Sequence, residues 1–366
     1  MTMKIVQVTS YYPPHLGGME NVVKEISNIL ASRNHDVEVF TSDSGLNKPK
    51  KTVSKNLKVY YMRSWEIAHT PIFPKLFLKL FTLPRDSIIH LHASQAFTPE
   101  IVMIISIIKK IPYIVHIHLD VDPSGFFGFL LEPYKKYILS AVLNKSDKVI
   151  CLTEEQKKYA SKKYNINIKN IEVVPNGVSK EFFIKRNKIC NKKNYNLLFV
   201  GRLSPQKNLP FLIKSISQLK NKVTLNIVGD GEEKENIHKL IKDNNFKNIK
   251  MHGYKKGEEL IRFYKESDLF LITSEKEGLS LSMLEAMAAS LPVVGLDVPG
   301  VRELIHDCGV LVSKKSEKEY AKTIDNILSD KSLRKNLSQS SYKKAKKYTW
   351  EKVVDKLEKI YLKVGK

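Results

Sequence analysis

Two glutamates eight residues apart, Glu277 and Glu285, mark the stretch of this 366-residue chain with the clearest capacity to bind a ligand. They lie in SEKEGLSLSMLEAMAASLP, residues 274–292. Eight residues exceed two helical turns, so the carboxylates cannot pair tightly on one helix. A loop holding Glu277 before a helix holding Glu285 would offer backbone N–H groups to an anion, and carboxylates accept hydrogen bonds from hydroxyl groups. The stretch suits a ligand with a phosphate and hydroxyl groups, such as a sugar nucleotide. The alternative is two acidic residues that only stabilise the start of a helix.

A second charged stretch, GRLSPQKN at residues 201–208, follows a predicted strand and opens a predicted helix. Gly201 lets the backbone come close to a ligand, and Arg202 and Lys207 bring two cations to the start of the helix. Two cations beside a helix N-terminus suit a diphosphate. The spacing is not that of a P-loop. A solvated basic loop is the alternative.

Histidines alternate with apolar residues in YIVHIHLD, residues 113–120. His116, His118 and Asp120 therefore share one face of a predicted strand. His118 ends the strand, which places it well for a cleft, although a buried core histidine is the alternative. Zinc is not expected, because no third and fourth ligands stand at a recognisable spacing.

The N-terminus predicts a strand at 4–9, a loop with Gly17 and Gly18, an amphipathic helix, and a strand at 36–41. This βαβ unit has a loop that phosphate groups can approach. It lacks the G-x-G-x-x-G pattern, so no dinucleotide cofactor is expected.

Strands and helices alternate through both halves of the chain, which predicts an α/β protein with two doubly wound domains facing a cleft. The polar, basic stretch 182–195 is interpreted as a linker. The expected organisation is a first domain at 1–181, the linker, a second domain at 196–345 and a C-terminal helix at 346–366 that crosses back to the first domain. Strands are predicted at 4–9, 36–41, 57–62, 87–92, 112–120, 148–153, 171–178, 196–201, 223–229, 249–253, 269–273 and 292–297.

The net charge is +23, from 61 Lys and Arg against 38 Asp and Glu, and it favours polyanionic partners. Nucleic acid is not expected, because the sequence shows neither aromatic stacking platforms nor a clustered basic face. Three scattered cysteines suggest neither disulfides nor a metal site, which favours the cytoplasm. No apolar run approaches the ~20 residues of a spanning helix. Segments 73–83 and 125–145 have the amphipathic composition of membrane-interface helices, or of surface helices that pack on a core.

These stretches together resemble the retaining glycosyltransferases of family 4, which have the two-domain GT-B fold. The resemblance covers nearly the whole chain, through the helix that begins near Trp350. The combination of GRL-x-x-x-KN with two glutamates eight residues apart is its most specific part. It rests on YYPPHLGGMENVV (11–23), VHIHLD around His118, VVPNGV (173–178), FVGRLSPQKN (199–208), VGDGEE (228–233) and EKEGLSLSMLEAMAASLPVV (275–294).

The resemblance implies an acceptor-side domain at 1–181 and a nucleotide-sugar domain at 196–345. It also implies roles for individual residues. Arg202 and Lys207 would hold the donor diphosphate and offset the charge of the leaving group. Glu277 would accept hydrogen bonds from the transferred sugar, Glu285 from the ribose, and His118 would lie near the reacting sugar. The catalytic set is thus His118, Arg202, Lys207 and Glu277. The other implied donor-binding positions are Gly17, Gly18, Asp230, Gly231, Gly278, Leu279, Ser280 and Leu281.

The implied reaction moves a hexose or N-acetylhexosamine from a UDP- or GDP-sugar to an acceptor hydroxyl, with retention and without a metal or other cofactor. The leaving phosphate would act as base; the alternative is Asp120 as a nucleophile. The expected acceptor is a lipid or lipid-linked glycan of cell-surface polysaccharide or glycolipid synthesis, at the cytoplasmic face of the membrane. The alternatives are a soluble sugar or sugar phosphate as acceptor, or a sugar-nucleotide epimerase of the same fold. Departures from the family at His116, Ser290 and Leu279–Ser280 leave the donor sugar open.

Overall fold

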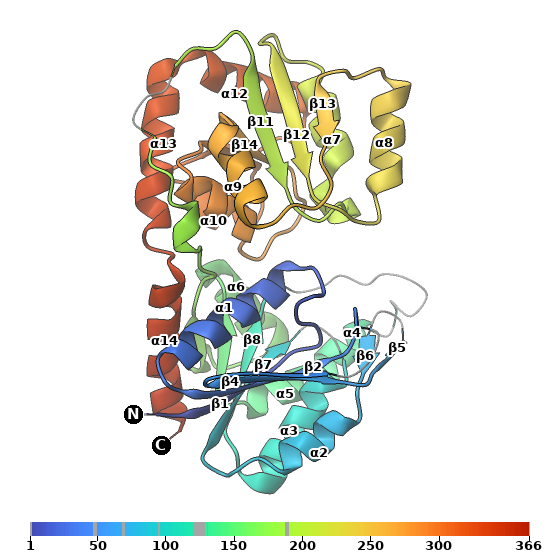
Figure 1. The fold of residues 1–366 in the computed structure, drawn as a ribbon, viewed down its shortest axis with the longest axis vertical. Coiled ribbons are helices and arrows are strands. Elements are labelled where there is room, and N and C mark those ends of the chain that lie inside the picture. Colours follow the sequence, from blue (N-terminus) through green and yellow to red (C-terminus); the bar gives the residue numbers. More distant parts are fainter. Residues whose placement is uncertain are drawn as a thin grey trace. The chain divides into compact units, whose positions relative to one another are not determined.

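The structure is a computed structural model, and it describes residues 2–46, 50–67, 70–93, 96–119, 129, 131–186 and 190–365. The chain divides into two compact units. The first unit combines Met1–Asn176 with Trp350–Lys366, and the second is Gly177–Thr349. Each unit alternates strands with helices around a sheet that is parallel except at the β3 edge of the first unit (Figure 1). The predicted α/β class with two doubly wound domains is confirmed.

The described residues of the first unit form an eight-stranded sheet in the order β10-β9-β8-β7-β1-β2-β4-β3. Central strand β1 is an almost unbroken apolar run, because helices cover both faces of a parallel sheet. The polar edge strand β3, which pairs antiparallel with β4, was not predicted. The strands are β1 (Lys4–Val8), β2 (Asp36–Ser42), β3 (Lys50–Ser54), β4 (Leu57–Met62), β7 (Ser87–Ala93), β8 (Tyr113–Ile117), β9 (Lys148–Cys151) and β10 (Ile171–Val173), with a separate hairpin of β5 (Trp65–Ile67) and β6 (Thr70–Ile72).

Figure 1 shows α1 and α14 on one face of this sheet and α2, α3 and α5 on the other. The C-terminal helix α14 packs against α1, as expected for a helix that returns to the N-terminal domain. Arg33, at the end of α1, bonds Glu358 of α14 at 2.5 Å. The helical segments are α1 (Gly18–Ser32), α2 (Lys75–Phe81), α3 (Thr98–Lys109), α4 (Leu131–Pro133), η2 (Tyr134–Leu139), α5 (Ser140–Lys145), α6 (Glu154–Tyr164), η3 (Ile168–Asn170) and α14 (Trp350–Val364).

The apolar residues of segment 73–83 divide into two sets. Buried in the core are Phe73, Leu76 and Leu80. Exposed are Phe77 at 37%, Leu78 at 65% and Phe81 at 49%. Helix α2 therefore packs on the core and also presents apolar side chains outward. No helix among the described residues is long and apolar enough to cross a membrane. Within the other segment, 125–145, residues 125–128 and 130 lie outside the described residues.

The described residues of the second unit form a six-stranded parallel sheet in the order β13-β12-β11-β14-β15-β16. The first strand of the unit, β11, thus lies between β12 and β14, which is the point where doubly wound sheets bind ligands. The strands are β11 (Tyr195–Val200), β12 (Val223–Val228), β13 (Ile249–Met251), β14 (Leu269–Ile272), β15 (Val293–Leu296) and β16 (Val310–Val312). The helical segments are η4 (Lys180–Phe182), η5 (Pro205–Lys207), α7 (Leu209–Ile216), α8 (Lys234–Asp243), α9 (Gly257–Glu266), α10 (Leu281–Ala288), α11 (Val301–Ile305), α12 (Glu317–Ser329) and α13 (Lys331–Ala345).

Candidate functional site

Three loops meet at the carboxyl ends of β12, β11 and β14 in the second unit. They are residues 229–233, 201–208 and 273–280. The Leu203 N–H donates to the Asp230 carbonyl at 2.9 Å, and the Glu275 N–H donates to the Gln206 carbonyl at 3.0 Å. The charged stretches that were separate in the sequence are therefore joined through their backbones.

Glycines at two positions allow these loops to come this close. Gly229 has a φ of +147°, and a Cβ there would lie 1.9 Å from the Gly201 carbonyl oxygen. Gly300, before α11, has a φ of +79°, and a Cβ there would lie 2.1 Å from the Gly278 carbonyl oxygen. A side chain at either position would force the loops apart.

Lys207 and Glu277 form an ion pair inside the site. The Lys207 ammonium donates to Glu277 Oε1, and the Ser274 hydroxyl donates to the same oxygen at 2.6 Å. The side chains are only 18% and 7% exposed. Thr273 holds the Lys207 main chain through a hydrogen bond from Oγ1 to the Lys207 carbonyl at 2.9 Å. The two residues expected to bind one donor therefore also bind each other.

Arg202 is the more accessible cation of the pair expected at the diphosphate. Its side chain is 67% exposed, and its contact with the Glu232 carboxylate is long, at 3.7 Å. Asp230 instead bonds the Lys234 ammonium at 3.0 Å and accepts from the Gly231 N–H at 2.9 Å. The hydrogen bond from Lys234 lowers the pKa of Asp230. Arg202 is thus free to reach an anionic ligand.

Glu285 lies on α10 and is held by a tyrosine that sequence reasoning missed. The Tyr264 hydroxyl donates to Glu285 Oε2 at 2.6 Å, and Tyr264 itself is fully buried. Burial raises the pKa of Glu285 to about 7, although the Tyr264 hydrogen bond opposes this shift. The carboxyl group of Glu285 therefore titrates near neutral pH. Nothing in the sequence singled out Tyr264 as a site residue, because it is one aromatic residue among others on an amphipathic helix.

Helix α10 begins where the resemblance implies a binding role for backbone amides. The Ser280 hydroxyl accepts from the Met283 N–H at 3.4 Å and caps the helix. Gly278 and Leu279 come directly before this cap, and Leu281 is the first residue of the helix. The first N–H groups of a helix have no intrahelical partner and suit an anion.

In the first unit, His118 follows β8 and is half-buried. Its ring stacks on that of His116 with centroids 4.2 Å apart, and its Nε2 lies 2.9 Å from His92 Nδ1. His90 and His92 of β7 complete a row of four rings on one face of the sheet. Sequence reasoning singled out the pair on β8 and missed the pair on β7, although SIIHLH has the same alternation. Asp120 lies outside the described residues.

His90, His92 and His116 bring one ring nitrogen each within 4.8 Å of one another. Their ring planes are nevertheless inclined to one another by no more than 32°. His90 stacks on His92 at 22° and on His116 at 11°. A metal ion lies close to the plane of each imidazole that binds it, so stacked rings do not direct three lone pairs at one ion. Among the described residues, this histidine row is therefore a weak candidate for a metal site.

Gly17 and Gly18 stand at the start of α1, as predicted. A Cβ on Gly17 would lie 2.1 Å from Glu20 Oε2. The carboxylate of Glu20 is buried and lies 2.8 Å from His15 Nδ1. Gly17 therefore leaves room for the Glu20–His15 pair, which the sequence did not indicate.

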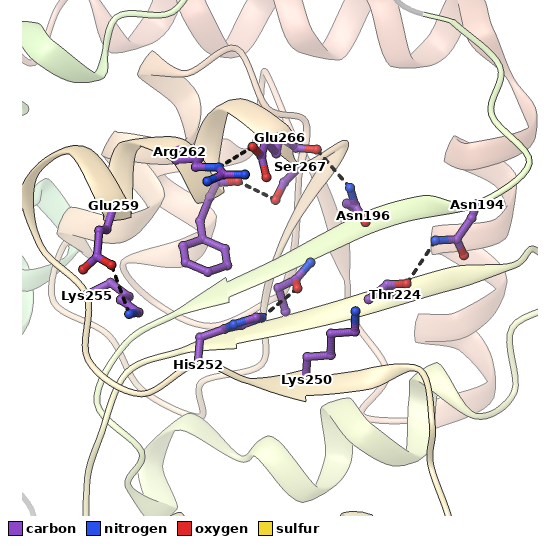
Figure 2. A pocket seen from close by; sticks show the side chains of 12 residues that line it. Asn194, Asn196, Thr224, Lys250, His252, Lys255, Glu259, Arg262, Glu266 and Ser267 are labelled. Carbon is purple, nitrogen blue, oxygen red and sulfur yellow. Dashed lines mark hydrogen bonds and ion pairs between the residues drawn. The ribbon is translucent and has the colours of Figure 1, made fainter.

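A cavity of about 540 Å³ opens along the face of β13, β12 and β11, beside α9 (Figure 2). Its polar side chains largely bond one another. His252 Nε2 lies 2.9 Å from Asn226 Oδ1, and Arg262 Nε donates to Glu266 at 2.6 Å. The cavity runs along the sheet face and not across the joined loops described above, and none of the predicted site residues lines it.

Comparisons with known proteins match both units. The family described as Glycosyltransferase Family 4 matches residues 16–182, and Glycosyl transferases group 1 matches residues 180–344. An uncharacterized glycosyltransferase of Methanocaldococcus jannaschii is 28% identical over 98% of both chains. An O-antigen biosynthesis glycosyltransferase of Escherichia coli is 29% identical over 86% of this chain and 88% of the relative. The Anabaena protein HepE, solved with UDP and glucose, superposes with a TM-score of 0.77 at 18% identity, over 98% and 99% of the two chains.

Proposed function

Since this chain belongs to glycosyltransferase family 4 and has the GT-B fold, we propose that it transfers a hexose or N-acetylhexosamine from a UDP- or GDP-sugar to an acceptor hydroxyl with retention. The observation that carries the proposal is the joined set of loops in the second unit. The loops carry an exposed cation, an ion pair and a capped helix start around the carboxyl ends of three strands.

Arg202 and Lys207 are proposed to bind the donor diphosphate. Their charges would stabilise the negative charge that develops on the leaving group. Because Lys207 is paired with Glu277, the diphosphate would take over part of the Lys207 charge when it binds. Glu277 would then accept a hydrogen bond from a hydroxyl of the transferred sugar. Two fixed cations supply the charge, so the proposed reaction needs no metal.

The other proposed donor contacts follow the family resemblance. Glu285 would accept hydrogen bonds from the ribose, and Asp230 with Gly231 would lie by the base. Backbone amides at 278–281 would bind phosphate oxygens. His118 and the glycine backbone at 17–18 are also proposed to contact the donor.

The proposed retention of configuration relies on the leaving diphosphate as the base. Retention would proceed by attack on the face that the leaving group departs from, with a phosphate oxygen taking the proton of the incoming hydroxyl. Arg202 and Lys207 would hold that phosphate in place while its negative charge grows. No separate general base is required by this route.

The proposed acceptor is a lipid or lipid-linked glycan at the cytoplasmic face of a membrane. Phe77, Leu78 and Phe81 of α2 are exposed, and α3 packs against α2 with its own exposed apolar residues. The exposed residues of α3 are Ile104, Ile107 and Ile108. Exposed Lys75 and Lys110 flank this apolar surface, which is the composition that binds anionic membranes. The E. coli relative named for O-antigen biosynthesis is consistent with a glycan acceptor. A soluble sugar or sugar phosphate is the second candidate.

A thermal-shift screen against UDP- and GDP-sugars tests the donor, because a ligand that binds the folded state raises the melting temperature. The stabilising donor is then incubated with and without a lipid-linked acceptor. Transfer that needs the acceptor, with the α-configuration of the donor kept in the product, supports the proposal. A changed sugar without any acceptor would reveal an epimerase instead. A protein stabilised by none of the nucleotide sugars would contradict the proposed donor class.

A further inference from the structure

A continuous hydrogen-bonded path runs from the centre of the first sheet to His118. Gln7 Oε1 on β1 lies 2.7 Å from His92 Nε2 on β7. The other nitrogen of the same ring, His92 Nδ1, lies 2.9 Å from His118 Nε2. Both ring nitrogens of His92 are therefore used, one toward Gln7 and one toward His118.

Burial keeps the middle of this path uncharged. Gln7 is 0% exposed and His92 is 1% exposed. Burial lowers the pKa of His92 well below its usual value, and the neighbouring histidines lower it further. A neutral imidazole carries one N–H and one bare nitrogen, so each of its two hydrogen bonds has a fixed direction.

The directions follow from the one group in the path that can only accept. The Gln7 carbonyl oxygen has no proton, so His92 Nε2 must donate to it. His92 Nδ1 is then bare and must accept from His118 Nε2–H. His118, itself neutral, is left with a bare Nδ1. We propose that Gln7 and His92 are positioning residues that hold His118 in the Nε2–H tautomer, so that Nδ1 accepts a hydrogen bond from a hydroxyl of the bound sugar.

The C-terminal helix contacts the same face of the sheet. The Tyr361 hydroxyl of α14 lies 2.7 Å from His90 Nδ1. The amide nitrogen of Gln7 has no hydrogen-bond partner among the described residues, and the amide oxygen faces His92. The tautomer of His118 is thus set by residues from β1 and β7.

This role differs from that of a general acid. Burial lowers the pKa of His118 to about 3, so the ring stays neutral across the ordinary working range. A neutral ring with a bare Nδ1 accepts a proton in a hydrogen bond but has none to give on that side. The hydrogen bond between His118 and a sugar hydroxyl rests on the proposed function; the tautomer does not.

Nitrogen NMR of the full chain labelled with [¹⁵N]histidine tests the tautomer without any substrate. Long-range ¹H–¹⁵N correlations distinguish a protonated ring nitrogen from a bare one, and loss of signals in His118→Gln assigns the residue. We expect a single Nε2–H tautomer at His118 in the wild type and a mixture in Gln7→Leu. Ile5→Val, on the same strand and sheet face, is the packing control and should keep the wild-type pattern. An Nδ1–H tautomer in the wild type, or an unchanged tautomer in Gln7→Leu, overturns the proposal.

Transfer kinetics supply the second measurement. With UDP- and GDP-sugars as donors, Gln7→Leu should lower kcat/KM about tenfold, as expected when one hydrogen bond to the substrate is lost. Ile5→Val should stay within about twofold of the wild type. Equal kcat/KM values for Gln7→Leu and Ile5→Val would show that the tautomer of His118 does not affect sugar transfer. A chain that transfers no sugar but shows the expected tautomer would refute the proposed function and leave the positioning role standing.

Discussion

The Lys207 ammonium and the Glu277 carboxylate bind each other, and the Ser274 hydroxyl donates to the same carboxylate oxygen at 2.6 Å. Both charged side chains are largely buried. Removing one member of such a pair leaves the other charge without compensation. The pair therefore affects stability as well as the proposed chemistry, and single substitutions must be designed to separate the two.

Lys207→Ala is expected to lower kcat/KM by about 10²–10³, the usual effect of losing one preorganised charge at a leaving group. It should also cost about 1–3 kcal/mol of unfolding free energy, because the Glu277 carboxylate loses its hydrogen-bonded counter-ion. In the double variant Lys207→Ala with Glu277→Gln, much of the stability should return while activity stays low. Lys214→Ala, an exposed lysine on α7, is the control. Recovery of activity together with stability in the double variant would contradict a role for Lys207 in transfer.

Arg202→Ala should weaken donor binding without a change in melting temperature, because the side chain is 67% exposed and weakly paired. Arg202→Lys should recover only part of the affinity, since an ammonium cannot donate as a fork to two phosphate oxygens. Calorimetric titration with UDP and with GDP measures both effects. Arg262→Ala, an exposed arginine beside the cavity of Figure 2, is the matched control. Equal affinities for wild type and Arg202→Ala would exclude the proposed contact.

Gly300→Ala should damage the site, because its Cβ would meet the Gly278 carbonyl oxygen at 2.1 Å. Gly257→Ala is the control, with a φ of +55° and no atom within 4 Å of the added carbon. The control carries only backbone strain, about 1 kcal/mol. Gly300→Ala should lose about 3 kcal/mol and also donor affinity, as the loop of Glu277 is displaced. Equal melting temperatures for the two variants would show that the loop moves aside freely.

The raised pKa of Glu285, about 7, predicts how one substitution changes with pH. Between about pH 4.5 and about pH 7, the folded chain still holds the Glu285 proton that the unfolded chain has lost. The free energy of unfolding therefore falls as pH rises through this range and stays constant above it. Glu285→Gln removes this cost and keeps an acceptor for Tyr264. Its melting temperature relative to wild type should therefore rise across that range, by the equivalent of about 3 kcal/mol. A difference that does not change with pH would place the Glu285 pKa near its usual value.

Leu78→Asp and Phe77→Asp should abolish binding to anionic liposomes, since both side chains are exposed on α2. Their melting temperatures should change little. Lys79 is a poorer choice, because its ammonium lies 4.1 Å from the ring centroid of Tyr60 and contributes to packing. Ile168→Asp, an exposed apolar residue of η3, is the control. If wild-type protein fails to bind liposomes at low salt, the membrane proposal is wrong.

Sequence motifs identified the family, the fold class and the enzyme class, and all three are confirmed. The fold could be predicted because parallel strands buried on both faces must be apolar along their length. Edge elements were missed for the same reason. Strand β3 is polar and exposed, and β16 is only three residues long, so neither has the pattern of a buried strand. The roles of the individual site residues remain predictions.

The sequence by itself determined which loops would carry the charged residues, because each loop follows a strand at its carboxyl end. Only the tertiary structure decided which of those residues bind one another. Lys207 and Glu277 are 70 residues apart, and Gln7 and His92 are 85 apart. Such contacts depend on the order of strands in the sheet, which local periodicity does not encode. The pairing of Lys207 with Glu277 and the row from Gln7 to His118 therefore had to be read from the fold.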